Sequence, residues 1–539
     1  MKLEKISIRN FRSIESLEIT FINNQTIFVG ENNVGKSSII EAIGKALHPE
    51  SGWDSEEWYL RERDRTIEIN LTFALDESQI KEIISLFDIT VEEFKEIFTD
   101  KLNYKFEKSL DRSFSIFRFG DFNIEKNMGW FGDQFKSYKP IYWKELLKQI
   151  RESGGKITLK KIKEILELES KVISDSSDEF GFEGDIRIDF GDDISQKLLN
   201  ILRRSMVFIE EFRERPQKTL GEFLSSPTGR ELTSVLFNLK NSRQKAKFEE
   251  IRTIFNKLFP NLDLDVIREN GEIRVLIRKN NVESTTFFIG SGILESIQIL
   301  THVIAHGDKV ICIDHPELHL HPHTQRLLSD FIRTMKDSQI LIVTHSPYFV
   351  NLDKNSDVIR VFQDHAQTKV VQLLKGYFQD SDYNKLSQFL DANSKELFFA
   401  RKVVLVEGST ELGALPVFSS EIYNFDENGI TIISVGGKNN FEFFAKLCTG
   451  FNLPCLIIAD KDAESIIIEK ICKNYPTIKF YILPKEFDDI LPPQIVEEAK
   501  KVVGEKSKPR IGRYIAKRLL ELREIPKEIK EIIEEVKSL

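Results

Sequence analysis

Two groups of residues in this chain have the types and the spacing that chemistry on phosphate groups requires. The first lies in residues 30–37, GENNVGKS, which match the pattern G-x-x-x-x-G-K-[ST]. An apolar strand pattern, TIFV, precedes this loop, and a helical pattern, SSIIEAIGKAL, follows it. In such a loop the backbone N–H groups bind phosphate oxygens, the lysine reaches the terminal phosphates and the serine hydroxyl binds Mg²⁺. The predicted nucleotide-binding residues of the loop are Gly30, Asn32, Asn33, Gly35, Lys36, Ser37 and Ser38.

Three residues farther along the chain complete the predicted ATP site. Asp314 ends the apolar run KVICID, where a carboxylate serves the Mg²⁺ side of a phosphate loop. His345 follows the run QILIVT and is placed to contact the terminal phosphate or the attacking water. Ser291 lies in a Gly-Ser-Gly turn that opens a predicted helix, which is a second anion site.

The second group consists of carboxylates that follow two apolar strand patterns. Glu407 comes directly after KVVLV, and Glu411 comes one helical turn later. Asp460 and Asp462 come directly after CLIIA. Because the carboxyl ends of parallel strands meet at one edge of a sheet, we expect these four carboxylates to converge on divalent metal.

The elements that must position these groups predict an α/β chain with two sheet-forming parts. Residues 1–75 alternate with period two and contain the phosphate loop, as the ATPase N-terminal part. Residues 76–285 are mainly helical in period, with one long helical stretch over residues 229–259, and we expect an insertion that also adds strands to a sheet-containing domain. Residues 286–395 return to short apolar strands, and the pattern restarts as a second α/β domain over residues 400–539, with strand patterns in KVVLVEG, ITIISVGG, CLIIAD and KFYILP.

The composition is that of a globular chain without a membrane span. Charged residues make up 30% of the chain and the net charge is −9, which argues against coating nucleic acid by bulk charge but leaves room for a local basic groove. None of the four cysteines forms a CxxC pair, which is typical of the reducing cytoplasm. No uninterrupted apolar run approaches the ~18 residues of a membrane span. We therefore expect a cytoplasmic protein that contacts no membrane.

The order of the first group of motifs resembles the ABC-type ATPases of the SMC and OLD (overcoming lysogenization defect) kind. The resemblance implies a homodimer or higher homo-oligomer in which Ser291 of one subunit closes over ATP held by the other. It also implies that the mainly helical insertion, residues 76–285, helps to dimerise the ATPase. Residues 314–322, DHPELHLHP, correspond to the family pattern D/E-E-P-E-x-x-L-H-P. Where the family has a glutamate that polarises the attacking water, this chain has His315. An imidazole accepts a proton but lacks the fixed negative charge, so we expect slow hydrolysis, or ATP used mainly as a clamp.

The second group, E-G-x-x-E after one strand and D-x-D after another, resembles the Toprim domain of OLD nucleases. The resemblance implies a metal-dependent phosphodiesterase in which the four carboxylates hold one or two Mg²⁺ or Mn²⁺ ions. It also implies that Asp488, in LPKEFDDIL, completes the second metal site and that Lys508, before Pro509, reaches the scissile phosphate. The basic run from Lys500 to Arg518 is suited to track a phosphate backbone.

Together these features predict an ATP-regulated DNA endonuclease of the OLD family. Family membership implies anti-phage defence of the Gabija or retron type. The partner would be a helicase-like protein, or a reverse transcriptase with its DNA. The alternative is an ATP-dependent DNA clamp or sensor whose Toprim domain binds without cutting. The intact set of four acids speaks against that alternative, because binding alone does not require them.

Overall fold

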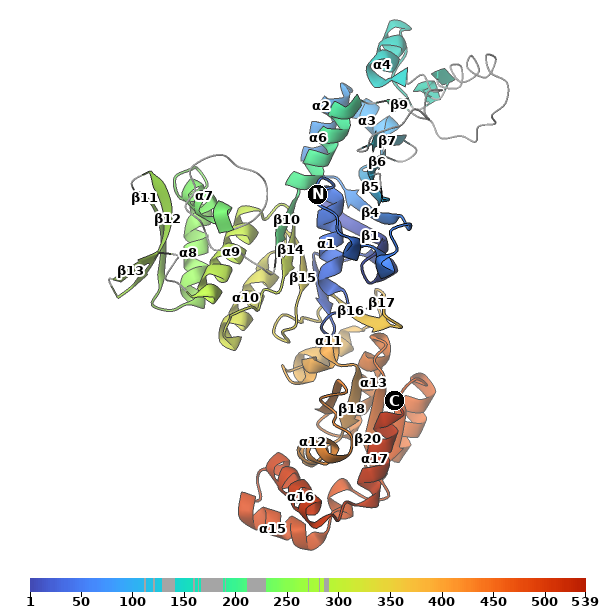
Figure 1. Cartoon of the computed structure of the whole chain (residues 1–539), viewed down its shortest axis with the longest axis vertical. Helices are drawn as coiled ribbons and strands as arrows, with labels where there is room; N and C mark the ends of the chain where they lie inside the picture. Colours follow the sequence, from blue (N-terminus) through green and yellow to red (C-terminus); the bar gives the residue numbers. More distant parts are fainter. Residues whose placement is uncertain are drawn as a thin grey trace. The chain divides into compact units, whose positions relative to one another are not determined.

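The computed structural model (Figure 1) describes residues 1–110, 113–119, 122–127, 141–158, 160–162, 164–165, 188–189, 191–210, 229–269, 271–280, 282–285 and 290–539. The described chain divides into two compact units. The first comprises residues 1–26, 34–344 and 363–369, and the second comprises residues 27–33, 345–362 and 370–539. Within the described ranges, no helix is both long enough and apolar enough to cross a bilayer.

An antiparallel sheet forms from the alternating segments near the N-terminus, in the order β2-β1-β4-β5-β6-β7. Its strands are β1 (Lys2–Phe11), β2 (Ile14–Thr20), β4 (Ile67–Ala74), β5 (Lys101–Lys108), β6 (Ser113–Phe119) and β7 (Phe122–Asn127). Along β4, buried residues alternate strictly with half-buried ones, as period-two patterning predicts. Residues after position 76 therefore add strands to this sheet.

A second sheet has the order β10-β14-β15-β3-β16-β17 and holds the predicted ATPase strands. They are β3 (Gln25–Val29), β10 (Met206–Ile209), β14 (Val310–Asp314), β15 (Gln339–Val343), β16 (Ser356–Asp364) and β17 (Gln367–Gln372). Every residue of β3, β14 and β15 is buried. Burial on both faces explains why these strands read as continuous apolar runs. Helices α1 (Lys36–Leu47), α6 (Gly191–Arg204), α9 (Ser291–Ala305) and α10 (Pro322–Thr334) belong to the first unit.

The region between the two parts of the ATPase contains separate helices and a small sheet. Helices α2 (Glu77–Phe87), α3 (Val91–Ile97) and α4 (Trp143–Glu152) form as predicted. The stretch expected to be one long helix is two helices, α7 (Gly229–Lys240) and α8 (Lys245–Leu258). The break falls at a turn in which the Ser242 hydroxyl accepts a hydrogen bond from the Gln244 N–H at 3.1 Å, so the serine competes with the helix for a backbone donor. Strands β11 (Asp263–Glu269), β12 (Glu272–Lys279) and β13 (Val282–Thr285) follow as an antiparallel sheet.

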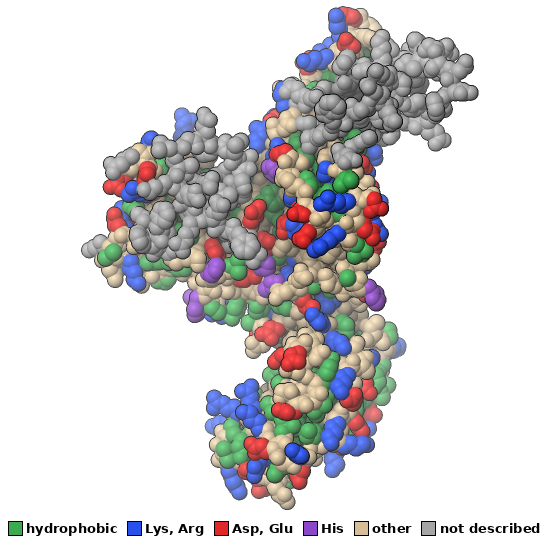
Figure 2. Space-filling view, viewed as in Figure 1, with side chains coloured by type: hydrophobic (Ala, Val, Ile, Leu, Met, Phe, Trp, Pro, Cys, Tyr) green, Lys and Arg blue, Asp and Glu red, His purple; other side chains and the backbone are tan. Residues whose placement is uncertain are grey.

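The C-terminal part of the second unit is a parallel sheet in the order β19-β18-β20-β21. Its strands, β18 (Lys402–Val406), β19 (Ile430–Ser434), β20 (Cys455–Ala459) and β21 (Lys479–Ile482), are the four that the sequence predicts. Helices α12 (Ser409–Ile422), α13 (Phe441–Gly450), α15 (Pro493–Val503), α16 (Lys508–Leu522) and α17 (Lys527–Lys537) complete it. Lysine and arginine side chains gather over α15 and α16 (Figure 2).

Helices α12 and α16 approach each other backbone to backbone at two glycines. A Cβ on Gly413 of α12 would lie 2.0 Å from the Pro509 carbonyl oxygen, and a Cβ on Gly512 of α16 would lie 2.2 Å from the Thr410 carbonyl oxygen. Neither neighbour is a side chain that can rotate away. The two glycines therefore fix the first turn of α16 against the first turn of α12.

We predict that Gly413→Ala destabilises the second unit, although alanine is the better helix former. The new methyl group overlaps a backbone carbonyl, and overpacking of this kind costs about 1–3 kcal/mol. Thermal unfolding followed by circular dichroism should show a transition lowered by several degrees. Gly52→Ala is the matched control, because nothing lies within 4 Å of its Cβ position. Equal unfolding midpoints for the two variants would contradict the close approach of α12 and α16.

Candidate functional site

The phosphate loop joins the buried strand β3 to the start of α1, and its backbone takes conformations that favour glycine. Gly30 has φ 139° and Gly35 has φ 99°, and both lie in the left-handed region. Lys36 is the first residue of α1 and is only 4% exposed, and Ser37 follows it in the first helical turn. A buried cation at a helix N-terminus below a glycine loop is chemically suited to bind phosphate.

Two hydroxyl side chains support this loop from distant parts of the chain. The Thr368 hydroxyl donates to the Val34 carbonyl at 2.8 Å, and the Ser13 and Thr368 hydroxyls lie 2.7 Å apart. A Cβ on Gly35 would lie 2.5 Å from the Thr368 hydroxyl oxygen, so only glycine fits there. Sequence reasoning missed both residues, because no local pattern links positions more than 300 residues apart.

Asp314 and Ser37 lie together, as the nucleotide site requires. Asp314 is the last residue of β14, and the Ser37 hydroxyl donates to its Oδ1 at 3.2 Å. The aspartate side chain is 12% exposed, which keeps it next to the loop and largely out of bulk water. The hydroxyl and the carboxylate are both oxygen ligands of the kind that Mg²⁺ prefers.

His315 is held between acidic neighbours. Its Nδ1 lies 3.1 Å from Glu317 Oε1, and its Nε2 lies 3.6 Å from Asp314 Oδ1. The Thr344 hydroxyl donates to the other Glu317 oxygen at 2.7 Å and fixes that carboxylate. Glu317 was part of the quoted motif but was not predicted to act on His315. The sequence signal for this contact was the spacing of two residues between His315 and Glu317.

The turn that carries Ser291 packs against the loop after Asp314. Ser291 is the first residue of α9, and Gly290 precedes it as the N-cap. A Cβ on Gly292 would lie 2.3 Å from the His319 carbonyl oxygen, and His319 Nδ1 lies 2.8 Å from Glu295 Oε1. The Ser291 turn and the segment after β14 therefore form one packed unit.

His345, in the second unit, lies two residues after the end of β15. Its ring is 6.1 Å from that of Phe399. Its contact with the terminal phosphate of a nucleotide, or with the attacking water, stays a prediction.

The predicted carboxylates of the C-terminal sheet lie at one edge. Val406 pairs with Ile458 in the parallel register of β18 and β20, so Glu407 and Asp460 leave neighbouring strands at the same end. Glu411 lies in the first turn of α12, where its Oε1 accepts the Gly408 N–H at 3.1 Å. Asp462 follows in a short 3-10 turn, Lys461–Ala463.

These carboxylates raise one another's pKa. Burial raises the pKa of Asp460 to about 7, and the charges of Glu411, Glu407 and Asp462 contribute, although Asp460 accepts the Phe487 N–H at 2.9 Å. Burial, followed by the charge of Asp462, raises the pKa of Glu407. Burial also raises the pKa of Glu411, and the charge of Asp488 adds to the effect. Negative charge is therefore concentrated at this edge.

Lys438 is a cation in this acidic cluster that the sequence prediction did not include. Its Nζ lies 2.5 Å from Asp462 Oδ2, while the preceding Gly437 N–H donates to the Glu407 carbonyl at 3.1 Å. Gly436 and Gly437 take φ values of 71° and 121°, which favour glycine. The signal was the run SVGGKNN after β19, the third strand end at the same edge.

The cluster offers the oxygen ligands that a divalent metal prefers, although its side chains do not form a closed ligand shell. Glu407 Oε2 is buried without a hydrogen-bond partner among the described residues, which leaves a hard oxygen ligand available. In the described chain, no three acidic, histidine or cysteine side chains stand close enough to hold an ion together as placed. Asp488 lies in the turn Phe487–Ile490, and Lys508 is the first residue of α16.

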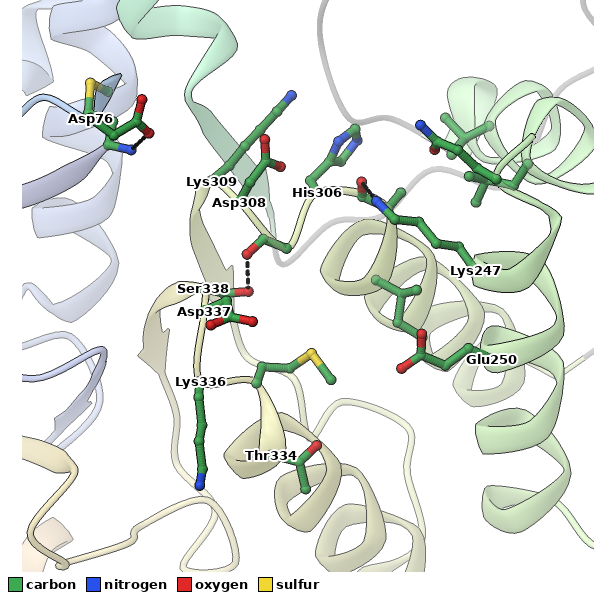
Figure 3. Close-up of a pocket in the computed structure, with 18 of the residues that line it drawn as sticks. Asp76, Lys247, Glu250, His306, Asp308, Lys309, Thr334, Lys336, Asp337 and Ser338 are labelled. Carbon is green, nitrogen blue, oxygen red and sulfur yellow. Dashed lines mark hydrogen bonds and ion pairs between the residues drawn. The ribbon is translucent and has the colours of Figure 1, made fainter. Parts of the chain in front are cut away.

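A cavity of about 1330 Å³ lies away from all of these residues (Figure 3). It opens at the start of β14 and β15, the opposite strand ends from Asp314. Lys247, Glu250, Asp308 and Lys309 line it with mixed charge, and Lys247 Nζ donates to the Ala305 carbonyl at 2.9 Å. None of the predicted site residues lines this cavity.

Family models match both parts of the chain. The model of the AAA ATPase domain matches residues 1–350, and the model of the overcoming lysogenization defect protein-like TOPRIM domain matches residues 398–462. The first range contains the phosphate loop, and the second contains Glu407 and Asp460. The two matches imply nucleotide binding and the use of divalent metal. The predicted fold class, an α/β P-loop ATPase domain followed by a Toprim domain, is confirmed.

The chain is similar, at low identity, to several curated relatives. An OLD nuclease of Thermus scotoductus is 22% identical over 488 residues, which cover 86% of this chain and 83% of that protein. The endonuclease GajA of Bacillus cereus is 23% identical over 495 residues, which cover 86% and 76%. An uncharacterized protein of Methanocaldococcus jannaschii is 25% identical over 272 residues, and these cover 49% of this chain but only 33% of that protein. The chain belongs to the AAA ATPase domain family, whose model covers residues 1–350, and its C-terminal part matches the OLD-like TOPRIM domain over residues 398–462.

Proposed function

We propose that this protein is an ATP-regulated, divalent-metal-dependent DNA endonuclease that acts in the cytoplasm in anti-phage defence. The observation that carries the proposal is the carboxylate cluster at the ends of two neighbouring parallel strands, formed by Glu407, Glu411, Asp460 and Asp462. Burial, together with the charges of acidic neighbours, raises the pKa of Glu407, Glu411 and Asp460. Such a concentration of charge destabilises the fold unless a cation compensates it. A role in metal-dependent chemistry explains why it is there.

Each residue of the cluster has a proposed task. Glu407 and Asp460 hold a first ion, and Glu411, Asp462 and Asp488 complete a second site. Bound Mg²⁺ or Mn²⁺ supplies an activated water and stabilises the leaving oxygen of a phosphodiester. Lys508, at the start of α16, contacts the scissile phosphate. The proximity of α16 to the first turn of α12 supports this assignment, because Gly413 and Gly512 fix the two helices together.

The ATPase part is proposed to control when the cluster acts. Lys36, Ser37 and Asp314 bind the phosphates of ATP and its Mg²⁺. His315, oriented by Glu317, accepts a proton from the attacking water, and Ser291 acts on ATP held by a second copy of the chain. Hydrolysis is slow, because an imidazole replaces the fixed negative charge of a glutamate.

A partner component is part of the proposal. The relative named endonuclease GajA supports a Gabija-type system with a helicase-like partner, and a retron with its reverse transcriptase and DNA is the other form. The alternative function, a DNA clamp or sensor that does not cut, is favoured by the absence of three close metal-ligating side chains among the residues described. The two functions differ in whether metal produces nicked DNA.

The direct test is nicking of supercoiled plasmid with Mg²⁺ or Mn²⁺, with and without ATP. We expect Glu407→Gln and Asp460→Asn each to reduce nicking at least about 10²-fold, because each removes a metal ligand. ATP binding should persist in both variants. Glu421→Gln, at an exposed position near the end of α12, is the control and should nick normally. Nicking that survives both substitutions would overturn the endonuclease assignment and favour a clamp.

Metal binding at the cluster should strengthen as pH rises. With the pKa of Asp460 at about 7, protons compete with the ion below that value, because only the ionised carboxylate binds metal. In nucleotide-free protein we expect the apparent Kd for Mn²⁺ to fall by up to about tenfold per pH unit between about pH 6 and pH 7, and to level off above. Titration calorimetry measures this, with Asp460→Asn as the variant that loses the dependence. A flat profile in unmodified protein would refute it.

Turnover of ATP tests the role of His315. We expect slow hydrolysis that falls by about 10²-fold in His315→Ala while ATP affinity stays the same, because the variant loses only a proton acceptor. Lys36→Ala should lose ATP binding itself. Phosphate release and nucleotide binding are measured on the same samples. A brisk rate that disappears in Lys36→Ala but is unchanged in His315→Ala contradicts the role given to His315.

A further inference from the structure

One surface of the α15–α16 helix pair carries only basic charge that is left without ionic partners. We call it the basic face. Its exposed members are Lys500, Lys501, Lys506, Lys508, Arg510, Arg513 and Lys517. Figure 2 shows this gathering of lysine and arginine side chains at the end of the second unit. Glu505 is the single acidic residue between positions 500 and 518. A chain with a net charge of −9 therefore concentrates positive charge here.

The basic face has no internal compensation within the part of the chain that the structure describes. None of its seven members forms an ion pair there, whereas Arg518, at its border, pairs with Glu521 at 3.0 Å. On helix α17 two of the three lysines are paired, Lys527 with Glu531 at 3.0 Å and Lys537 with Glu534 at 2.5 Å. Unpaired like charges repel one another. Binding of a polyanion to such a face is therefore favourable, because it relieves the repulsion.

The basic face is fixed to the helix that carries Glu411. The backbone contacts at Gly413 and Gly512 fix α16 against the first turn of α12, one helical turn from the Glu407 strand end. Helix α15 is joined to α16 by the Tyr514 hydroxyl, which donates to Glu498 at 2.7 Å. A ligand on this face is therefore held at a constant position relative to the carboxylate cluster.

The side-chain types on this face distinguish among nucleic acids. Tyr514 is the only aromatic residue in α15 and α16, and its hydroxyl is engaged with Glu498. Surfaces for single strands combine basic residues with aromatic platforms on which bases stack. A face of lysines and arginines without a stacking platform is suited mainly to phosphate contacts, which fits the backbone of a duplex.

We propose that the basic face binds the sugar–phosphate backbone of duplex DNA next to the carboxylate cluster, without sequence preference, and holds the strand to be cut. The inference rests on the proposed function in taking DNA as the substrate. It requires no cleavage, so it can be measured separately.

The test is equilibrium binding of a fluorescent duplex of random sequence at several KCl concentrations, in EDTA, on full-length protein carrying Glu407→Gln. The triple variant Lys506→Gln/Arg510→Gln/Arg513→Gln removes three exposed cations and leaves Lys508 in place. We expect the slope of log K against log salt to fall by about 2–3, near 0.9 per phosphate contact, with at least a tenfold loss of affinity at low salt. The matched control is Lys527→Gln/Lys530→Gln/Lys537→Gln on α17, which should bind as before.

Three outcomes would overturn the inference. Unchanged slope and affinity in the basic-face variant exclude the face as the DNA surface, and an equal loss in the α17 variant shows a non-specific charge effect. Equally tight binding of polyglutamate would assign the face to an acidic protein. Unchanged thermal unfolding of both triple variants keeps the comparison valid. Duplex binding through the face in a protein that nicks with neither metal would refute the proposed endonuclease while leaving this inference intact.

Discussion

Repulsion among carboxylates at one sheet edge is the constraint on which the C-terminal part of the structure depends. Burial raises the pKa of Asp460 to about 7, and the charges of the nearby Glu411, Glu407 and Asp462 make a smaller contribution in the same direction. The surrounding fold must withstand this repulsion. It does so with the fully buried strand β20, with the Gly408 N–H donating to Glu411, and with Lys438, whose ammonium lies against Asp462. Positive charge is thus built in where negative charge accumulates.

The same arrangement occurs in the ATPase part with fewer charges. Asp314 ends a buried parallel strand, and Ser37 approaches it from the start of a helix. In each case parallel strands deliver polar groups to one edge, while glycines let the backbone come close enough to complete the site. A single physical scheme therefore serves two phosphate chemistries, one on a nucleotide and one proposed on DNA.

The sequence was most informative where function depends on neighbouring residues. The phosphate loop, the E-G-x-x-E and D-x-D pairs and the four strands of the Toprim sheet were all predicted from local pattern. Sequence reasoning failed where the contacting residues are far apart in the sequence. The hydrogen bond from the Thr368 hydroxyl to the Val34 carbonyl is an example, because no pattern relates the two positions. Sequence reasoning also missed Lys438, although that residue follows a predicted strand of the same sheet. The division of the stretch after Gly229 into α7 and α8 depended on one serine hydroxyl, which periodicity does not detect.

The proposed endonuclease function requires that the carboxylate cluster is a metal centre. Anomalous diffraction from crystals soaked in Mn²⁺ without nucleotide measures this most directly. The account predicts at least one Mn²⁺ peak with Glu407 and Asp460 oxygens at about 2.2 Å, and Lys438 moved away from Asp462. Well-diffracting soaked crystals with no peak at this sheet edge, and with Lys438 still paired to Asp462, would contradict it.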